Sequence, residues 1–375
     1  MYNLKCDIIL PVCDQFDFTK NCIESIIKYT DTPFKLIVIN NGKNEKTRAF
    51  LEGLKKKNII EVEVVYNSHN IGWVKALNMG MGMSSAPYLC FQNDDTIVTK
   101  SWLRKMINIL EKDEQFGLIN PAWEGRKNSQ SIDQYNSMLE KTFSGQFIET
   151  DWCRGFSVVL KRKVMEIAGK VDEIYGLAYF DDVDYSVTAI SKGFIPLVAL
   201  DTYVYHHRNV TFFQVLRGQR WNQLHEKNKK IYYKKWGKPL KFVFIIEENQ
   251  VRNEKTLSSF LNTVYATARN QHRIHVLSSS LQLKEKIKHT NILFHFCPQF
   301  ILNIYSGIKL LLNGMKKKDK RYSACFVFED NKPGVPLSGL SKIPVYFKEE
   351  TGYEFVIKKI NELKEKTKEG IDAEL

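Results

Sequence analysis

The beginning of the chain alternates short β-branched runs with helical patterns, and this alternation constrains the fold more than any other feature. Strand-like and helix-like segments follow one another in the order Asp7–Leu10, Thr19–Tyr29, Lys35–Ile39, Lys46–Lys56, Glu61–Tyr66, Trp73–Met83 and Tyr88–Gln92. Such a pattern is typical of βαβ units, which build a mainly parallel sheet covered by helices. Thr19 is the expected N-cap of the first helix. We therefore expect an α/β fold.

Polar residues follow each of these predicted strands. They are Pro11–Asp14, Asn40–Gly42, Asn67–Gly72 and Asn93–Asp95. In open α/β sheets, ligands bind beyond the carboxyl ends of the strands. We therefore expect the four segments to border one crevice of a size that suits a nucleotide.

A second alternation follows a break at Gly237-Lys238-Pro239. Its segments are Phe242–Ile246, Thr256–Ala268, Arg273–Leu277, Gln282–Lys288, Ile292–Phe296, Gln299–Asn313, Ser323–Phe328, Ile343–Phe347 and Tyr353–Lys366. No glycine-rich phosphate fingerprint follows any of these strands. A chain of 375 residues is expected to hold about two domains. We predict domains at 1–238 and 239–375, the second a smaller Rossmann-like α/β unit.

The chain is basic, with 55 Lys and Arg against 42 Asp and Glu and a net charge of +13. This excess favours anionic partners such as nucleotides, phospholipid surfaces or nucleic acid. The helix-compatible segment Thr211–Trp236 carries five lysines between positions 227 and 235, which suit either a peripheral contact with an anionic membrane or, more simply, a solvated face. The lysine runs at 55–57 and 316–318 leave a nucleic-acid-binding protein as an alternative, although they lack interleaved aromatic residues.

The cysteines and the hydropathy pattern bear on the compartment. Seven scattered cysteines indicate neither a disulfide framework nor a CxxC zinc site. The residues before the first predicted strand lack the features of a signal peptide, and no apolar run reaches the ~18 residues of a membrane span. We expect a cytoplasmic protein, with at most a peripheral contact at the inner membrane face.

Three polar clusters carry candidate chemistry: Asn93-Asp94-Asp95, Asp181-Asp182-Val183-Asp184 and the adjacent His206 and His207. Neighbouring carboxylates after a strand are typical of a Mg²⁺ or Mn²⁺ site that bridges to a diphosphate, although either aspartate of the first cluster could instead cap the next helix. The second cluster is expected at the start of a helix. There, one carboxylate can cap the helix, one can act as a base, and the last can steady the turn. A purely structural role for the whole cluster is an equal alternative. Adjacent strand residues point to opposite sides, so at most one of the histidines is expected to reach a metal.

Taken in order, these motifs resemble the GT-A-fold glycosyltransferases of family 2 from about Asp7 to Gly237. The similar segments are Asp7–Asp14, Val38–Gly42, Asn70-Ile71-Gly72-Trp73 with Lys75 and Asn78, Asn93-Asp94-Asp95 in the place of the DxD motif, Asp151–Gly155, Val171-Asp172-Glu173, Asp181–Asp184 in the place of the Glu-Asp-x-Asp motif, and His206. Two positions depart from the family pattern. Asn93 replaces the first DxD aspartate, and Asp181 replaces the usual glutamate. The C-terminal unit lies outside the resemblance.

The resemblance implies a metal-dependent, inverting transfer of a sugar from a nucleotide-sugar donor to an acceptor hydroxyl. It implies donor contacts from Pro11, Val12, Asp14, Asn40, Asn41, Asn70, Gly72, Lys75, Asn93 and Asp94. It places Mg²⁺ or Mn²⁺ on Asp95 and His206, the general base at Asp182 or Asp181, and the acceptor near Trp152 and Arg154. The acceptor class is left open among glycans, lipid carriers, proteins and other hydroxyl compounds. A nucleotidyltransferase is a further alternative, since it also holds a nucleotide over strand ends with metal-bound carboxylates.

Overall fold

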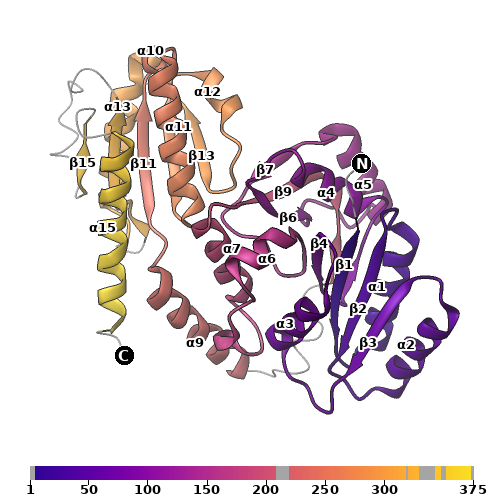
Figure 1. Ribbon diagram of the computed structural model, residues 1–375. Helices are drawn as coiled ribbons and strands as arrows, with labels where there is room; N and C mark the ends of the chain where they lie inside the picture. The colour runs from indigo at the N-terminus through magenta and orange to yellow at the C-terminus, as the bar shows by residue number, and fades with distance from the viewer. Residues whose placement is uncertain (1–4, 208–218, 318–319, 329–342, 348–351, 373–375) are drawn as a thin grey trace. The chain divides into compact units, whose positions relative to one another are not determined.

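The computed structural model describes residues 5–207, 219–317, 320–328, 343–347 and 352–372 (Figure 1). The chain divides into two compact units, Met1–Ile231 and Tyr232–Leu375. The change from one unit to the other falls inside helix α9 (Gln219–Trp236). The boundary expected from the sequence, between residues 238 and 239, lies just after the end of this helix.

Within the described residues, the first unit is built on an eight-stranded sheet with the order β3-β2-β1-β4-β8-β6-β9-β7. The strands are β1 (Cys6–Val12), β2 (Phe34–Asn40), β3 (Glu61–Tyr66), β4 (Tyr88–Gln92), β6 (Phe116–Ala122), β7 (Phe147–Glu149), β8 (Ser157–Lys161) and β9 (Ile195–Tyr203). A separate two-stranded ribbon pairs β5 (Thr96–Ile97) with β10 (Tyr205–His206). The helices are α1 (Phe16–Tyr29), α2 (Glu45–Lys57), α3 (Trp73–Met83), α4 (Trp102–Leu110), α5 (Ile132–Phe143), α6 (Arg162–Ala168), the short 3₁₀ helix η1 (Glu173–Tyr175), α7 (Asp181–Ser191) and α9.

The sheet is mainly parallel, as predicted. β3, β2, β1 and β4 pair in parallel, as do β6 and β9, while β7 and β8 run antiparallel to their neighbours. The central strand β1 is buried on both faces, because Ile8 packs in a cluster with residues of α1 and Ile9 in a cluster with residues of α3. A strand covered by helices on both sides is expected to be continuously apolar, which explains the sequence of β1. The predicted α/β fold class is confirmed.

Two local predictions at this sheet need correction. Thr19 does not cap α1, because the helix begins three residues earlier, at Phe16, with Gln15 in the N-cap position. β1 does not end at Pro11, which pairs with Ile39 of β2. Proline has no backbone N–H to donate, but the pairing of β1 with β4 already stops at Ile9, so the missing donor disrupts no ladder on that side.

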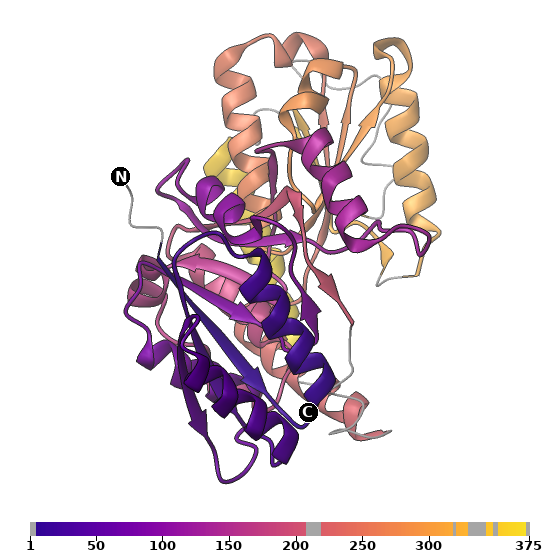
Figure 2. The same cartoon turned by 90° about the vertical axis from the view of Figure 1, so that its right-hand side faces the viewer.

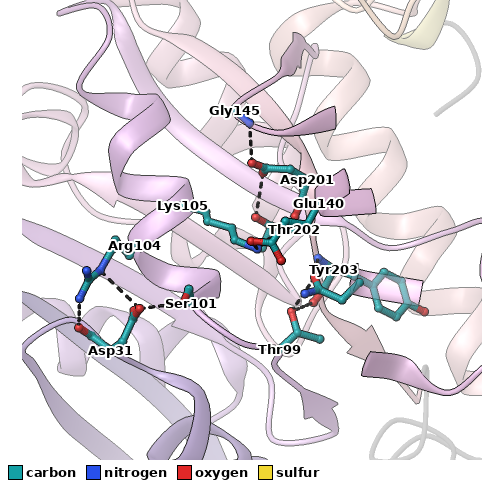
Figure 3. Close-up of polar contacts among 11 residues, drawn as sticks. Asp31, Thr99, Ser101, Arg104, Lys105, Glu140, Gly145, Asp201, Thr202 and Tyr203 are labelled. Atoms are coloured by element: carbon teal, nitrogen blue, oxygen red, sulfur yellow. Dashed lines mark hydrogen bonds and ion pairs between the residues drawn. The ribbon is translucent and has the colours of Figure 1, made fainter. Parts of the chain in front are cut away.

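A buried polar network joins the end of β9 to the segment after β5 (Figure 3). The hydroxyl of Thr99 lies 2.6 Å from the carbonyl oxygen of Tyr203 and 2.9 Å from Oδ1 of Asn136. The same Oδ1 accepts a hydrogen bond from the backbone N–H of Tyr203 at 2.9 Å. Because β10 follows Tyr203 almost directly, this network holds the ribbon strand that carries His206 beside β5.

Loss of the Asn136 side chain should weaken this anchor. We expect Asn136→Ala to lower the free energy of unfolding by about 1–3 kcal/mol, because the buried Tyr203 N–H loses its acceptor. Urea unfolding followed by circular dichroism measures the change. The exposed Asn128→Ala, in the same unit, is the control and should change the stability by less than about 0.5 kcal/mol. Equal stability of the Asn136 variant and the wild type would contradict the role of the network.

The second unit contains a parallel sheet with the order β13-β12-β11-β14-β15 in its described residues (Figure 2). The strands are β11 (Lys241–Ile246), β12 (Arg273–Ser278), β13 (Ile292–Phe296), β14 (Ala324–Phe328) and β15 (Val345–Tyr346). The helices are α10 (Glu248–Val251), α11 (Glu254–Arg269), α12 (Leu281–Lys286), α13 (Gln299–Gly314) and α15 (Tyr353–Asp372). Side chains of α11 and α15 share one core with Phe242 and Phe244, and side chains of α13 share another with Val243 and Ile245. The predicted second α/β unit is therefore present.

None of the helices in the described segments combines the length and the hydropathy that a membrane crossing needs.

Candidate active site

The loops after β1, β2 and β3 are tied to one another at the carboxyl edge of the sheet. The side chain of Asn67 donates to Oδ1 of Asn41 at 2.8 Å, and its backbone N–H donates to the carbonyl of Asn40. The Asn41 side chain donates to the carbonyl of Gly72, the N-cap residue of α3, at 3.4 Å. Asn70 accepts the Gly72 N–H through Oδ1 and lies 3.5 Å from the Cys13 sulfur. Residues predicted from separate strand ends therefore lie together.

Asp14, in the loop after β1, binds the loop after β2. Its Oδ1 accepts hydrogen bonds from the backbone N–H groups of Lys43 at 2.6 Å and Asn44 at 2.8 Å. A Cβ atom at Gly42 would lie 2.5 Å from the same oxygen, so only glycine allows this approach. Pro11 and Val12 are buried in β1, whereas Lys75 is exposed on α3. The carboxylate of Asp14 thus orders the backbone of the next loop.

The Asn93–Asp95 loop and the β5–β10 ribbon bring two potential metal ligands together. His206 pairs with Thr96 across the ribbon. Nε2 of His206 consequently lies 3.1 Å from Oδ1 of Asp95 and 3.4 Å from Nδ2 of Asn93. The Asp95 oxygen is buried and has no hydrogen-bond partner within the described part of the chain. An imidazole nitrogen and an unsatisfied carboxylate oxygen therefore face one another.

The two adjacent histidines differ in their surroundings. His206 stacks on Phe156, with ring centroids 5.0 Å apart. The ring of His207 instead packs edge-on against Phe18 and Tyr205. Burial lowers the pKa of His207. Of the two rings, only that of His206 lies within 4 Å of the Asp95 carboxylate.

Asp94 points away from the Asp95–His206 pair. Its Oδ2 accepts a hydrogen bond from the hydroxyl of Thr19 in α1 at 2.9 Å. Burial, together with the charge of Asp95, raises the pKa of Asp94 to about 7. A role for the Asp94 side chain as a second metal ligand is therefore not favoured. Helix α4 begins after Ser101 without a side-chain cap, so neither aspartate caps it.

The raised pKa of Asp94 predicts a pH-dependent stability. An aspartate in the unfolded chain titrates near 3.9, whereas folded Asp94 keeps its proton up to about pH 7. Unfolding between these values releases a proton, so stability falls as pH rises through this window. We expect Asp94→Asn to be more stable than the wild type by about 2–4 kcal/mol at pH 9 in EDTA, and by much less at pH 4. Urea titrations at both values, with the exposed Asp17→Asn as control, measure this difference; a pH-independent difference would contradict it.

The acidic cluster lies at the start of α7, where its three carboxylates point in different directions. Oδ2 of Asp182 accepts the Gly155 N–H at 2.9 Å, and Oδ1 accepts the Val183 N–H at 2.9 Å. Asp184 is buried and accepts the Tyr175 hydroxyl at 3.1 Å. Burial and the charge of Asp182 raise the pKa of Asp181 to about 8. Burial also raises the pKa of Asp182, while the two backbone N–H groups favour its ionised form. Of the neighbouring Asp181 and Asp182, the latter is better suited to carry the charge.

A strained turn precedes this cluster, and α9 holds it. Tyr179 and Phe180 both have positive φ angles, 71° and 68°, which are unfavourable for aromatic residues. The buried side-chain amide of Asn228 in α9 donates to the carbonyls of Tyr175 and Ala178 at 2.8 and 2.7 Å. Contacts with α9 therefore stabilise the backbone that positions the acidic cluster.

A pocket of about 520 Å³ lies within the first unit and joins the two polar centres. Asn93 and His206 line it from one centre, and Asp181 and Asp182 from the other. Its wall is largely aromatic. The remaining lining residues are Trp73, Trp123, Glu124, Trp152, Arg154, Gly155, Phe156, Ala178, Tyr179, Phe180, Val183 and His225. Such a surface suits a sugar ring, which packs its C–H face on aromatic rings.

Arg154 is held between two tryptophan rings of this pocket. Its guanidinium carbon lies 4.7 Å from the ring centroid of Trp123 and 4.6 Å from that of Trp152. Both backbone polar groups of Arg154 are hydrogen-bonded to the side chain of buried Asn120. The sequence analysis singled out Trp152 and Arg154 but missed Trp123, although it directly follows β6 and the strand-end rule could have found it.

Other pocket residues were not predicted. Tyr179 and Phe180 immediately precede the acidic cluster, and His225 comes from α9, far along the chain. In contrast, the predicted donor residues before Asn93 do not line the pocket; they lie at the ends of β1 and β2, on the loops that follow β1, β2 and β3, and at the start of α3. Asp95 is not among the lining residues either, although its oxygen approaches His206.

The residues at Asp95 partly fit a divalent cation. A carboxylate and an imidazole are ligands that Mn²⁺ accepts, and the buried Asp95 oxygen, which approaches the imidazole but has no hydrogen-bond partner among the described residues, is the observation that favours an ion. The described residues contain no cluster of three or more His, Cys, Asp or Glu side chains with metal-binding geometry. Two protein ligands leave positions for diphosphate oxygens and water, which is usual for cations that act on nucleotides.

Comparisons with known proteins show similarity to glycosyltransferases. Residues 7–165 match the family described as Glycosyl transferase family 2. An uncharacterized glycosyltransferase of Haemophilus influenzae is 34% identical over 107 residues, which cover 28% of this chain and 33% of that protein. An uncharacterized glycosyltransferase of Rickettsia bellii is 28% identical over 143 residues, 38% of this chain and 19% of that protein. The matched region therefore spans a third or less of these two relatives.

Solved structures of low sequence identity are also similar. The mannosyltransferase PcManGT from Pyrobaculum calidifontis, in complex with GDP-Man and Mn²⁺, is 16% identical, with 60% of this chain and 64% of that chain covered and a TM-score of 0.45. TarS 1-349 of S. aureus, in complex with UDP-GlcNAc, is 15% identical, with coverage of 62% and 71% and a TM-score of 0.42.

The motifs quoted from the sequence, the mainly parallel α/β sheet and the match over residues 7–165 together show that the N-terminal unit of this chain is similar to glycosyl transferase family 2.

Proposed function

We propose that this chain transfers a sugar from a nucleotide-sugar donor to an acceptor hydroxyl, with inversion at the anomeric carbon and with a divalent metal ion. One observation carries the proposal: the carboxylate of Asp182 and the imidazole of His206, beside Asp95, face the same pocket. A base and a diphosphate-binding centre on one cavity are what a single-displacement sugar transfer requires. We further propose residues 1–238 as the catalytic domain.

The donor nucleotide would lie along the strand-end loops. The side chains of Asn40, Asn41 and Asp14 hydrogen-bond within the loops of that edge and would shape the surface for the nucleotide, and Pro11 and Val12 form the end of the adjoining strand. Asn70 and Gly72 shape the entry to α3, and exposed Lys75 adds a positive charge one turn further on. The amide of Asn93, which lines the pocket, suits a ribose hydroxyl.

The acceptor would enter the aromatic pocket. Trp152 offers a ring face to an acceptor sugar, and Arg154 is fixed beside it. Asp182 would accept the proton of the attacking hydroxyl, since backbone N–H groups hold its carboxylate in place. Neighbouring Asp181, which keeps its proton at neutral pH, would not compete for this role. General-base assistance of this kind contributes about 10²–10⁴ in rate.

Asp95 and His206 would hold the divalent ion. When bound, such an ion neutralises charge on the leaving nucleoside diphosphate. The choice between Mg²⁺ and Mn²⁺ follows from which ion supports activity.

A panel of nucleotide sugars tests the proposal. The full chain is incubated with UDP-, GDP- and dTDP-sugars in the presence of Mn²⁺, Mg²⁺ or EDTA, and the released nucleotide is identified by mass. Release of nucleoside diphosphate in the presence of metal supports sugar transfer, and the NMR coupling constant of the product's anomeric proton reports inversion. Release of a sugar 1-phosphate, the leaving group of nucleotidyl transfer from these donors, would instead show a nucleotidyltransferase. No release from any donor, combined with no thermal stabilisation by nucleoside diphosphates, would overturn the proposal.

The cysteines are relevant to the cellular compartment. All seven cysteines are free thiols, which is typical of proteins in a reducing environment. We propose a cytoplasmic location on this ground.

A further inference from the structure

One face of α13, in the second unit, presents a row of exposed apolar side chains. Its members recur every three or four residues, as neighbours on one side of a helix do: Phe300, Ile304, Ile308, Leu311, Leu312 and Met315. We call these six residues the α13 stripe. Phe300 is 83% exposed and Met315 is 79% exposed. A contiguous apolar row of this kind commonly marks an interaction surface.

The opposite face of α13 is firmly packed. Leu302 and Leu310 are buried in the core formed with Val243 and Ile245 of β11. Ser306, Gly307 and Asn313 on the same face are also buried. The helix therefore already packs on its own sheet through this face. The α13 stripe is a second apolar face, on the other side of the helix. α13 appears in light orange at the right of Figure 2.

Positive charge adjoins the stripe. Lys316, Lys317 and Lys320 follow the C-terminal end of α13 and are exposed. Between Glu285 and Asp319 the sequence contains no acidic residue, and Asp319 is the single acidic residue among the lysines at 316–318 and 320. An exposed apolar row with cationic side chains at one end is complementary to an anionic surface that also has an apolar interior.

We propose that the α13 stripe docks the second unit on an anionic phospholipid surface. The apolar side chains would enter the boundary between headgroups and acyl chains, and the lysines would contact the anionic headgroups. A second copy of the chain fits less well, because pairing through this face would bring together two surfaces of the same charge. The proposal is independent of the sugar-transfer function, because it uses no residue of the first unit.

Vesicle co-sedimentation of the full chain tests this surface. We expect binding to vesicles of phosphatidylcholine with phosphatidylglycerol, weak binding to phosphatidylcholine alone, and a decrease with rising salt. The pair Ile304→Glu and Ile308→Glu should weaken binding about tenfold or more, and the pair Lys316→Glu and Lys317→Glu should also weaken it. Ile59→Glu, the same change at an exposed position of the first unit, is the matched control and should bind like the wild type.

Circular dichroism shows whether each variant is folded. If the variant with both glutamates does not fold, the milder pair Ile304→Ser and Ile308→Ser replaces it. Wild-type protein that fails to bind anionic vesicles at low salt would overturn the proposal. So would stripe variants that bind as tightly as the wild type. A dimer in solution that Ile308→Glu dissociates would assign the face to a second copy instead.

Discussion

Asp182→Asn should reduce turnover by about 10²–10⁴ while the affinity for the donor nucleotide stays within a few-fold of the wild-type value. The amide cannot accept the proton of the acceptor hydroxyl, yet it has nearly the same size and keeps one oxygen for a backbone N–H group. Turnover with a saturating donor and calorimetry with nucleoside diphosphate separate the two effects. Because burial raises the pKa of Asp182, wild-type turnover should also rise with pH as this carboxyl ionises.

Two neighbouring aspartates provide matched controls for this substitution. Asp181 is protonated near neutral pH, so Asp181→Asn replaces one neutral group by another and should leave turnover within about tenfold. Asp184 is bonded to the Tyr175 hydroxyl, so Asp184→Asn should change stability more than turnover. If Asp181→Asn abolishes turnover and Asp182→Asn does not, Asp181 is the base instead.

Asp95→Asn and His206→Ala should each weaken Mn²⁺-dependent binding of a nucleoside diphosphate about tenfold to a hundredfold, equivalent to about 1.4–2.8 kcal/mol. Each change removes or weakens one of the two proposed ligands, whose nearest atoms lie 3.1 Å apart. Calorimetry in Mn²⁺ and in EDTA is the measurement. In EDTA both variants should bind the nucleotide as the wild type does, because the lost affinity depends on the ion.

His207→Ala is the matched control for the histidine. Its ring packs on Phe18 and Tyr205, so the change should lower stability without shifting the Mn²⁺ requirement. If the wild-type protein binds the nucleoside diphosphate equally well in Mn²⁺ and in EDTA, the metal ion is removed from the proposal. If His207→Ala weakens the Mn²⁺-dependent binding of the nucleotide more than His206→Ala does, His207 is the ligand instead.

Much of the fold could be predicted from local patterns. The predicted bounds of Glu61–Tyr66, Trp73–Met83 and Tyr88–Gln92 coincide with β3, α3 and β4. The first two segments have a clear period, the third is a short continuously buried run, and all three are bounded by residues that interrupt regular structure. Errors arose where tertiary contacts override local preference. Thr19 has the character of an N-cap but bonds Asp94 instead, and the strand continues through Pro11 because only one neighbour pairs there.

The candidate site could be predicted in part. Sequence reasoning indicated the three polar clusters, because their residue types are chemically informative wherever they lie. It missed Trp123, Tyr179 and His225, since an aromatic residue has the same local signal in a core as in a pocket wall. The stabilising contact of Asn228 with the strained turn was also invisible, because it joins residues about fifty positions apart.

By itself, the sequence determined the alternation of strands and helices, the order of the motifs and hence the resemblance to glycosyl transferase family 2, because these depend on local periodicity and side-chain chemistry. Only the tertiary structure decided that His206 rather than His207 faces Asp95, that Asp94 turns to α1, and that Asp181 and Asp182 have unequal surroundings. The physical reason is that side-chain direction and burial depend on strand pairing and on backbone donors contributed by remote segments. The β5–β10 ribbon and the Gly155 N–H are such contributions, and no local pattern encodes either of them.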